Sequence, residues 1–288
     1  MSPLRACCVR AFPVPQIRPD GGGGRYEINN TMKKNQLAAQ LYTCREITKT
    51  PFEISRTLRR VREAGYTAVQ ASGLGPIADG ELIRMLDGEG LTCCATHEPG
   101  ALILKEPQRV VERLARLRCK FTAYPFPSGI NLSDPAALHG LIENLEESGA
   151  VLAASGMTLC YHNHHQEFRK TGGATILEKI YSSTSARHLQ GELDTYWVQY
   201  GGGDPAAWCE RLSGRLPLIH LKDYMVNDEN EPAYCEIGSG NLDFARIVAA
   251  AEKAGCQYFI VEQDETPGDP VDSLSQSFRH LAENICKE

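Results

Sequence analysis

The chain has 288 residues, of which 42% are hydrophobic, and no apolar run approaches the roughly 20 residues that cross a bilayer. Its formal net charge is −6 and it has no long run of Lys or Arg, which argues against a nucleic-acid groove, because such a groove needs clustered basic residues. We therefore expect a soluble, cytoplasmic protein with a large core and with neither a membrane nor a nucleic acid as partner.

The first 31 residues differ in composition from the rest of the chain. They contain Pro13, Pro15 and Pro19 and the run Gly21–Gly24. Their apolar stretch is interrupted by Arg10, so it does not form the hydrophobic region of a secretory signal. We predict a disordered extension over residues 1–31 and a single domain over residues 32–288.

The eleven cysteines are scattered along the chain, and no C-x-x-C pair occurs. Several of them, such as Cys44, Cys93 and Cys160, lie in or beside apolar segments. A secreted scaffold would be shorter and denser in cysteine. The pattern predicts free, mostly buried thiols in a reducing compartment and argues against a cysteine-based zinc site.

From Leu37 onward, short runs typical of β-strands alternate with amphipathic runs typical of helices. After the first strand, Ile54, Leu58 and Val61 have the i, i+4, i+7 spacing of one helix face. A later helix begins at Asp134-Pro135, where Asp caps the helix and Pro takes its first position. Strands are predicted at residues 37–42, 67–71, 91–96, 121–126, 158–162, 188–194, 216–220 and 257–262, with helices near 54–61, 82–86, 110–117, 135–152, 174–181, from 204, 244–254 and 271–281.

Alternation of this kind predicts parallel strands joined by right-handed crossover helices. Eight units that close on themselves form a (β/α)₈ TIM barrel, which takes about 250 residues as one domain. A doubly wound open sheet is the alternative, but it would usually carry a glycine-rich phosphate turn after its first strand. Here that position reads Thr43-Cys44-Arg45-Glu46, which favours the barrel.

The ends of the later strands carry most of the side chains that could do chemistry. Active sites of such barrels lie at the carboxyl ends of the strands. The two-residue period of a strand places His162 and His164 on one face, and it places Glu192 and Asp194 on one face. Mixed nitrogen and oxygen ligands suit Mn²⁺, Co²⁺, Fe²⁺ or Zn²⁺. The groups expected to converge on one divalent ion are His162 or His164, Asp194, His220 and Glu262.

Structural interpretations compete with this one. Asp194 and Asp264 could cap the helices that follow their strands. Lys222 and Asp223 could form a surface ion pair of little energetic weight. Three further histidines lie on predicted helices or at the start of a predicted strand and are expected to be non-catalytic: His139, His188 and His280.

A set of short phrases falls at the strand ends in a fixed order: Tyr161-His162-Asn163-His164, Glu167-Phe168, Glu192-Leu193-Asp194-Thr195-Tyr196-Trp197, Gly202-Gly203-Asp204-Pro205, His220-Leu221-Lys222-Asp223, Gly238-Ser239-Gly240 and Val261-Glu262-Gln263-Asp264. Together they resemble the sugar phosphate isomerase/epimerase superfamily, the xylose-isomerase-like barrels. The resemblance covers the chain from about Gln36 to its end.

The resemblance implies a metal ion bound by His162, Asp194, His220 and Glu262. Family enzymes that epimerise free ketoses use two glutamates beside the metal, and the first of these falls on His162 here, which departs from that pattern. The His-rich fifth strand and the Glu-Gln-Asp phrase also resemble inosose dehydratases and 3-keto-glycoside lyases. A family position that often holds a His is Trp197, whose ring is suited to stacking on the C–H face of a sugar.

The hypothesis is a divalent-metal-dependent isomerase or epimerase that acts on a sugar or sugar-derived ketone through a metal-stabilised enediolate. Glu262 is the expected base and His164 or Glu167 the acid that returns the proton, while Lys222 holds a substrate hydroxyl or oxyanion. The residues expected to contact the substrate are His97, Trp197, Lys222 and Glu236.

The alternative is a lyase that uses the same site to dehydrate an inosose or to cleave a 3-keto-glycoside. The acidic balance argues against a nuclease, and a metal-free binding module is the remaining class. No phosphate loop or Arg cluster stands out, which favours an unphosphorylated substrate. The oligomeric state is open, with a homodimer as one option.

Overall fold

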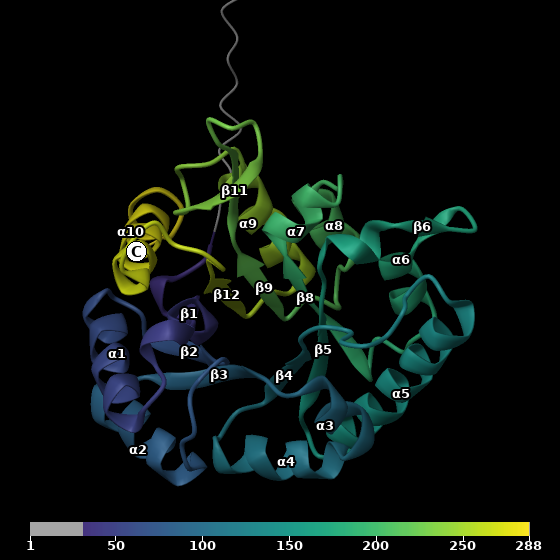
Figure 1. Ribbon diagram of the computed structural model, residues 1–288, viewed down its shortest axis with the longest axis horizontal. Coiled ribbons are helices and arrows are strands. Elements are labelled where there is room, and N and C mark those ends of the chain that lie inside the picture. Colours follow the sequence, from purple (N-terminus) through teal and green to yellow (C-terminus); the bar gives the residue numbers. More distant parts are fainter. Residues whose placement is uncertain (1–30, 288) are drawn as a thin grey trace, which may run out of the picture.

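Eight parallel strands close into a barrel in the computed structural model, which describes residues 31–287 of the chain. Helices form an outer ring around these strands (Figure 1). The barrel strands are β1 (Leu37–Gln40), β2 (Ala68–Ala71), β3 (Thr92–His97), β4 (Phe121–Tyr124), β5 (Thr158–His162), β8 (Leu189–Asp194), β9 (Leu218–Leu221) and β12 (Tyr258–Val261), and β1 pairs with β12 to close the ring.

The predicted (β/α)₈ barrel is therefore confirmed. Helices lie between the barrel strands at α1 (Pro51–Glu63), α2 (Asp79–Glu89), α3 (Gly100–Lys105), α4 (Pro107–Arg116), α5 (Pro135–Ala154), α6 (Ile176–Ser182), α7 (Thr195–Tyr200), α8 (Pro205–Arg211) and α9 (Phe244–Ala254), and α10 (Pro270–Asn284) follows the last strand. Shorter 3₁₀ segments are η1 (Lys34–Gln36), η2 (Leu41–Ile47) and η3 (His165–Phe168).

Several boundaries and small elements differ from the prediction. The first strand ends at Gln40, where the chain turns into η2, and the fourth ends at Tyr124, because Pro125 has no N–H for the strand ladder. The short helices α3 and α7 and two hairpins were not predicted. The hairpins are β6 (Lys170–Thr171) with β7 (Ala174–Thr175), and β10 (Asp223–Val226) with β11 (Pro232–Cys235).

The barrel has two hydrophobic cores, one inside the ring of strands and one between strands and helices. The outer core takes the predicted helix stripes, including Ile54, Leu58 and Val61 of α1, all fully buried. The inner core is small and combines Ala and Cys with three larger side chains from most strands: Ala38, Ala68, Cys94, Ala95, Phe121, Ala123, Cys160, Leu218 and Ile260. Such inward side chains form a packed layer rather than a pore.

The inner core fixes which side chains form the next layer towards the carboxyl ends. Because side chains two residues apart share a face, Gln40 follows Ala38 and Gln70 follows Ala68 on the inner face. By the same rule His162 follows Cys160, His220 follows Leu218 and Glu262 follows Ile260. A polar layer therefore lies directly above an apolar floor.

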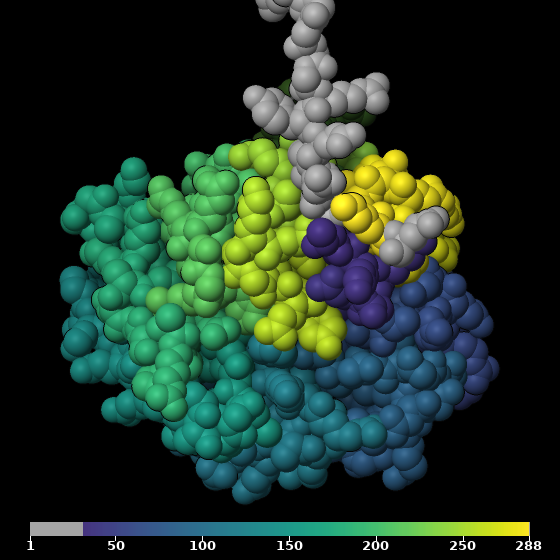
Figure 2. Space-filling model, turned by 180° about the vertical axis from the view of Figure 1, so that it is seen from behind, coloured from purple at the N-terminus to yellow at the C-terminus, as the bar shows by residue number. Residues whose placement is uncertain are grey.

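The first and last described residues lie side by side on the outside of the barrel. Lys33 pairs with Lys287, and the N–H of Lys287 donates to the carbonyl oxygen of buried Met32. Figure 2 shows this segment against the C-terminal helix α10. The predicted disordered extension, apart from Thr31, lies outside the described residues, so this division of the chain stays a prediction.

For the described part of the chain, the prediction of free, mostly buried thiols is confirmed, while the reducing compartment stays a prediction. The nine cysteines of this part are all free thiols, and each is buried except Cys286, which is partly exposed. Within residues 31–287, no helix combines the length and the apolar character needed to cross a membrane.

Candidate metal centre and active site

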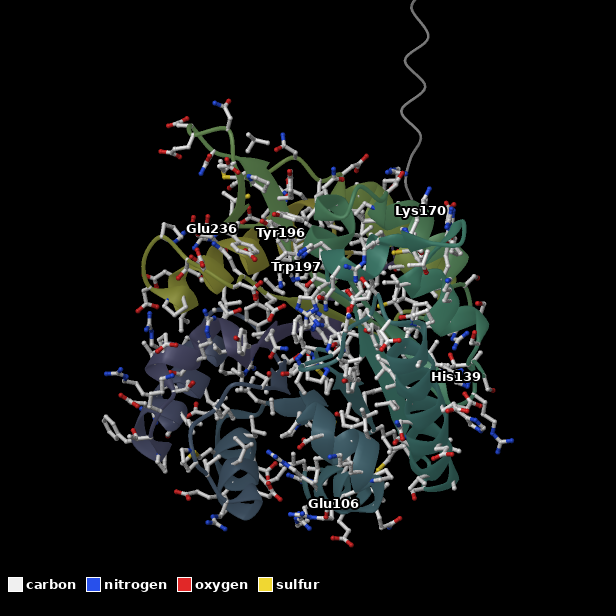
Figure 3. All side chains as sticks on the ribbon, turned by 45° about the vertical axis from the view of Figure 1, so that its right-hand side comes forward. Glu106, His139, Lys170, Tyr196, Trp197 and Glu236 are labelled. Atoms are coloured by element: carbon white, nitrogen blue, oxygen red, sulfur yellow. The ribbon has the colours of Figure 1, made fainter. Side chains whose placement is uncertain are left out.

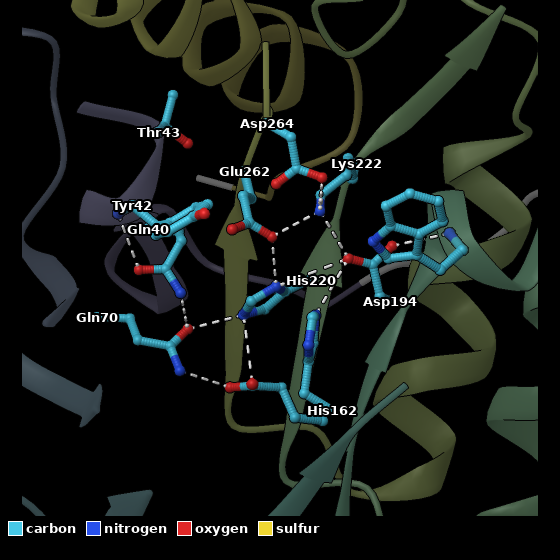
Figure 4. Close-up of polar contacts among 12 residues, drawn as sticks. Gln40, Tyr42, Thr43, Gln70, His162, Asp194, His220, Lys222, Glu262 and Asp264 are labelled. Carbon is cyan, nitrogen blue, oxygen red and sulfur yellow. Dashed lines mark hydrogen bonds and ion pairs between the residues drawn. The ribbon is translucent and has the colours of Figure 1, made fainter. Parts of the chain in front are cut away.

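The structure brings the four predicted ligands together at the carboxyl end of the barrel (Figure 4). His162, Asp194, His220 and Glu262 come from β5, β8, β9 and the end of β12. All four are buried, and each offers one ligand atom that lies within 4.8 Å of the others. The spacing and the mixed imidazole and carboxylate donors suit a first-row divalent ion.

The charges around this cluster also fit a cation. Asp194, Glu262, Glu192 and Asp264 contribute four carboxylates. Within residues 31–287, Lys222 is the one ammonium group among them, and it contacts Asp194, Glu262 and Asp264. Four negative charges and one positive charge leave a net −3 when the imidazoles are neutral. Buried charge of one sign is costly unless it is compensated. A divalent cation would supply most of that compensation.

The pKa of His220 reflects the same excess of negative charge. Burial by itself would lower the pKa of this imidazole, but Glu192 and Glu262 beside it raise the value to about 10. Its Nδ1 lies 2.8 Å from Glu262 Oε2, and its Nε2 lies 3.5 Å from Glu192 Oε2. The cluster therefore favours positive charge at its centre.

Asp194 caps a helix, as one interpretation of the sequence predicts, and its second carboxylate oxygen faces the cluster. Its Oδ1 accepts a hydrogen bond from the backbone N–H of Trp197 at 3.0 Å and so caps α7. Its Oδ2 faces the cluster, 3.3 Å from His162 Nε2 and 3.0 Å from Lys222 Nζ. Burial opposes its ionisation, but Lys222 and His162 hold the pKa of Asp194 at about 2. The capping bond orients the carboxylate towards the ion position.

Lys222 and Asp223 do not form a surface ion pair, so that interpretation is wrong. Lys222 is 1% exposed, and its Nζ lies 2.8 Å from Glu262 Oε2 and 3.1 Å from Asp264 Oδ2. Asp264 therefore pairs with Lys222. It does not cap the helix that follows, because the N-cap of α10 is Asp269.

Asp223 points to the other side and organises the loop after β11. Its Oδ2 accepts the N–H groups of Gly238 at 2.9 Å and Gly240 at 3.0 Å, and its Oδ1 accepts those of Tyr224 and Leu242. A Cβ on Gly240 would lie 2.4 Å from Asp223 Oδ1, so the loop needs glycine there. Hydrogen bonds to Asp223 thus hold the Gly238-Ser239-Gly240 motif beside the Lys222-Asp223 motif.

A second layer of side chains orients His220, and sequence reasoning missed most of it. Gln70 Oε1 accepts from Gln40 Nε2 at 3.0 Å, and Gln70 Nε2 donates to Glu192 Oε1 at 2.7 Å. With the amide held this way, Gln70 Oε1 accepts the Nε2–H of His220 at 2.7 Å. On its other side, Nδ1 of His220 donates to Glu262 Oε2 at 2.8 Å. An ion held by the cluster would replace that Nδ1 proton, while Gln70 keeps the ring oriented through Nε2–H, as the partners of metal-binding histidines do.

The residues of this second layer carry little chemical signal in the sequence. Gln40 and Gln70 are neutral and lie in the early strands, and only their position two residues after an inward-facing Ala marks them. Glu192 was recognised as sharing a face with Asp194 but was given no role. It is fully buried, and its Oε2 lies 2.5 Å from Nε2 of His97.

Glu262 and His164 are the groups best placed to move a proton. Both bonds of the Glu262 carboxylate, to His220 and to Lys222, go to Oε2, which leaves Oε1 without a hydrogen bond among the described residues (Figure 4). Burial opposes ionisation of Glu262, but Lys222 and His220 hold its pKa well below the usual range. The carboxylate is therefore ionised at neutral pH.

His164 lies at the edge of the same cluster. Its ring packs edge-on against the rings of His162 and Phe126, with centroids 4.8 Å and 4.9 Å away. Its Nδ1 is buried and has no hydrogen-bond partner within residues 31–287. Burial, together with His162 and Lys222, lowers its pKa well below the ordinary value, so the imidazole is neutral at pH 7.

A cavity of about 560 Å³ opens above the cluster. Its inner wall includes His97, His162, His164, Lys222 and Glu262. Ligand pockets of about 300–1,000 Å³ bury most of a small molecule, so this cavity can enclose a substrate against the cluster. His97 lines this cavity, so its predicted contact with a substrate is sterically possible.

The candidate ligands Asp194 and His220 lie beneath the cavity lining, and three residues predicted to act on or contact the substrate do not line the cavity either. Glu167 is fully buried and accepts from Tyr161 Oη at 2.9 Å and from the His164 N–H at 3.0 Å, so its carboxylate supports the fold of η3. Glu236 accepts from Ser273 Oγ at 2.7 Å, and Figure 3 shows it far from Trp197. Trp197 lies beside Lys222, whose Nζ is 5.7 Å from the ring centroid.

The histidines expected to be non-catalytic lie away from the cavity. His139 is exposed on the outside of α5 and pairs with Glu143 (Figure 3). His188 pairs with Glu146 at 2.7 Å. The ring of His280 packs against Gly238.

Comparisons with known proteins agree with this architecture. The family model for the xylose isomerase-like TIM barrel matches residues 58–284. Rhizopine catabolism protein MocC of Rhizobium meliloti is 26% identical over 81% of this chain and 81% of its own length. Inosose dehydratase of Geobacillus thermodenitrificans is 24% identical, but the match spans only 44% of this chain and 47% of that relative.

Solved structures show the same fold at low identity. A sugar phosphate isomerase/epimerase from Parabacteroides distasonis superposes with a TM-score of 0.73 at 22% identity, over 89% of this chain and 96% of that one. A xylose isomerase-like TIM barrel protein from Mycobacterium smegmatis, solved in complex with magnesium, has a TM-score of 0.66 at 14% identity, over 88% of this chain and 99% of that one.

Proposed function

Since the chain belongs to the xylose isomerase-like TIM barrel family, we propose that it is a divalent-metal-dependent isomerase or epimerase of a sugar or sugar-derived ketone. The observation that carries the proposal is the convergence of four candidate ligand side chains from successive barrel strands, two of which, His162 and Glu262, line a cavity. The sugar phosphate isomerase/epimerase with the same fold supports it.

His162, Asp194, His220 and Glu262 would hold the ion. Its positive charge would polarise the substrate carbonyl and make the adjacent C–H acidic. Lys222 lines the cavity beside these ligands and would stabilise the oxyanion by charge. His97, which reaches the cavity from β3, would contact a substrate hydroxyl.

Glu262 is the base in this mechanism. Its Oε1 removes the proton on the carbon next to the carbonyl, and the electron pair moves to the carbonyl oxygen. The resting imidazole of His164 is neutral, so it would first take up a proton from solvent and would then deliver that proton to carbon, which gives the epimer or the isomer. Glu262 would release the abstracted proton to solvent. Glu167, the other acid considered, is directed away from the cavity by its bonds to Tyr161 and His164.

The test measures the exchange of deuterium from D₂O into unphosphorylated ketoses and keto-glycosides. Deuterium that enters at the carbon next to the carbonyl reports proton abstraction, whatever product forms. Replacing Glu262 by Gln keeps the size of the side chain and should lower the exchange rate at least about 100-fold. Glu265→Gln is the matched control, because Glu265 lines the cavity without touching the cluster. Near-normal exchange in Glu262→Gln at an unchanged melting temperature would remove Glu262 from the mechanism.

A lyase with the same site is the second candidate, and the environment of His162 favours it. His162 Nδ1 donates to the carbonyl of Pro125 at 3.2 Å, while Nε2 faces Asp194. No second carboxylate therefore comes from β5 to share protons symmetrically with Glu262. An elimination needs one base and one acid for the leaving group. Glu262 would be the base, and His164, after taking up a proton from solvent, would be the acid. Loss of water from an inosose, or release of an aglycone from a 3-keto-glycoside, would identify a lyase.

A further inference from the structure

The cavity extends well beyond the metal cluster, and its outer part has a different character. The inner end is formed by His162, Lys222 and Glu262, while the outer end is lined by Tyr42 and Phe126. Its volume of about 560 Å³ lies in the range that encloses drug-sized ligands. A single sugar ring held against the cluster would leave the outer part unfilled.

Tyr42 and Phe126 are unusual in being large, hydrophobic and exposed, at 39% and 45%. In the described part of the chain only three other large hydrophobic side chains are exposed: Phe52, Tyr200 and Val226. None of those three lines the cavity. Exposed aromatic rings that gather at one opening mark a binding surface, and aromatic faces stack on rings that present C–H or π surfaces.

Both rings are held in place before any ligand arrives. The Arg45 guanidinium lies 4.5 Å from the centroid of the Tyr42 ring, and it donates to the Tyr42 carbonyl oxygen. Gly73 (φ +68) makes room for the ring edge, because a Cβ there would lie 2.8 Å from Tyr42 Cδ2. Phe126 packs edge-on against His164. Rings that are already ordered lose little entropy on binding.

The charges that line the cavity as a whole argue against a phosphate, although Arg45 lies beside Tyr42. Of the cations that line the cavity, Lys222 is engaged by three carboxylates, and Arg45 is the other. Glu98, Asp264 and Glu265 line the same cavity. An anionic group would meet net negative charge there.

We infer that Tyr42 and Phe126 form a second subsite that stacks an uncharged second ring attached to the reacting sugar. The inference rests on the proposed function, since the cluster fixes the reacting ring. It assigns the substrate class: keto sugars that carry a further sugar or aromatic ring, in preference to free monosaccharides or sugar phosphates.

The test compares methyl and phenyl 3-keto-β-D-glucopyranoside in the D₂O assay with metal-loaded enzyme. The phenyl compound should have a kcat/KM about tenfold higher, mostly through KM, because its second ring can stack. Tyr42→Ala and Phe126→Ala should each remove most of that preference. Tyr200→Ala and Phe52→Ala, exposed aromatics outside the cavity, are the matched controls and should keep it.

A second readout does not depend on turnover. Phenyl β-D-glucopyranoside has no ketone and cannot react, so saturation-transfer NMR should show its phenyl ring in contact with the wild-type protein and lose that contact in Phe126→Ala. Equal kcat/KM for both keto compounds, or a preference for the 6-phosphate, would overturn the subsite and leave the proposed function standing. Failure to exchange either compound would overturn both.

Discussion

The first four strands of the barrel and the last four end at the same mouth, but they bring different chemistry to it. β5, β8, β9 and β12 lead into the charged groups, namely the four candidate ligands and Lys222. β1 and β2 bring the neutral amides Gln40 and Gln70, and the segments after β1 and β4 bring the aromatic rim.

This difference shows how the side chains of a buried, carboxylate-rich cluster are held in their orientations. Neutral amides can hold a histidine without adding charge to a site that already carries an excess of carboxylates. Gln70 does this from β2, across the barrel from β9, while His97 from β3 contacts Glu192. The late half would supply the reactive charge, and the early half would supply orientation and shape.

The largest effect is expected in the late half, at a ligand. Asp194→Asn keeps an oxygen for the helix cap but removes the negative charge that faces the cluster. We expect the affinity for Mn²⁺ or Zn²⁺, measured by isothermal titration calorimetry with metal analysis of the purified protein, to fall by more than the 10–100-fold that outer-shell changes cost. Asp264→Asn is the control. Unchanged affinity in Asp194→Asn would separate the four side chains from metal binding.

A smaller effect is expected in the early half, at the amide that orients His220. Gln70→Leu is close in size but loses the hydrogen bonds to His220, Glu192 and Gln40. Metal affinity should fall about 10–100-fold, because outer-shell partners hold ligating histidines in the correct orientation and tautomer. Gln40→Leu, which touches His220 only through Gln70, should cost less. If Gln70→Leu binds metal like the wild type, the early half does not orient the ligands.

The smallest difference is expected in packing, where the two halves should behave alike. Burial raises the pKa of Cys44 in the early half to about 12, and it raises the pKa of Cys160 and Cys256 in the late half well above the ordinary value. The thiolate is the reactive form, so these thiols stay protonated and unreactive at pH 8. Peptide mass spectrometry after iodoacetamide should find them unmodified in the native protein and modified after denaturation. Selective labelling of Cys44 would show that the early half opens more readily.

Much of the ligand set could be predicted because it depends on local patterns. The two-residue strand period and the strand ends predicted His162 or His164 together with Asp194, His220 and Glu262, and the structure gathers His162 with the other three. Glu167 and Glu236 were misplaced because they follow the strands, in η3 and after the β10–β11 hairpin, where the strand period no longer predicts direction. The membrane, nucleic-acid and homodimer expectations stay predictions.

By itself the sequence determined the alternation of elements, the barrel and the strands that carry charge, because hydrophobic periodicity and strand-end residues are properties of neighbouring positions. Only the tertiary structure decided that Gln70 reaches His220, that Asp194 both caps a helix and faces the cluster, and that Lys222 and Asp223 point to opposite sides. Those outcomes depend on the register in which eight strands close, and strand register joins residues that lie far apart along the chain.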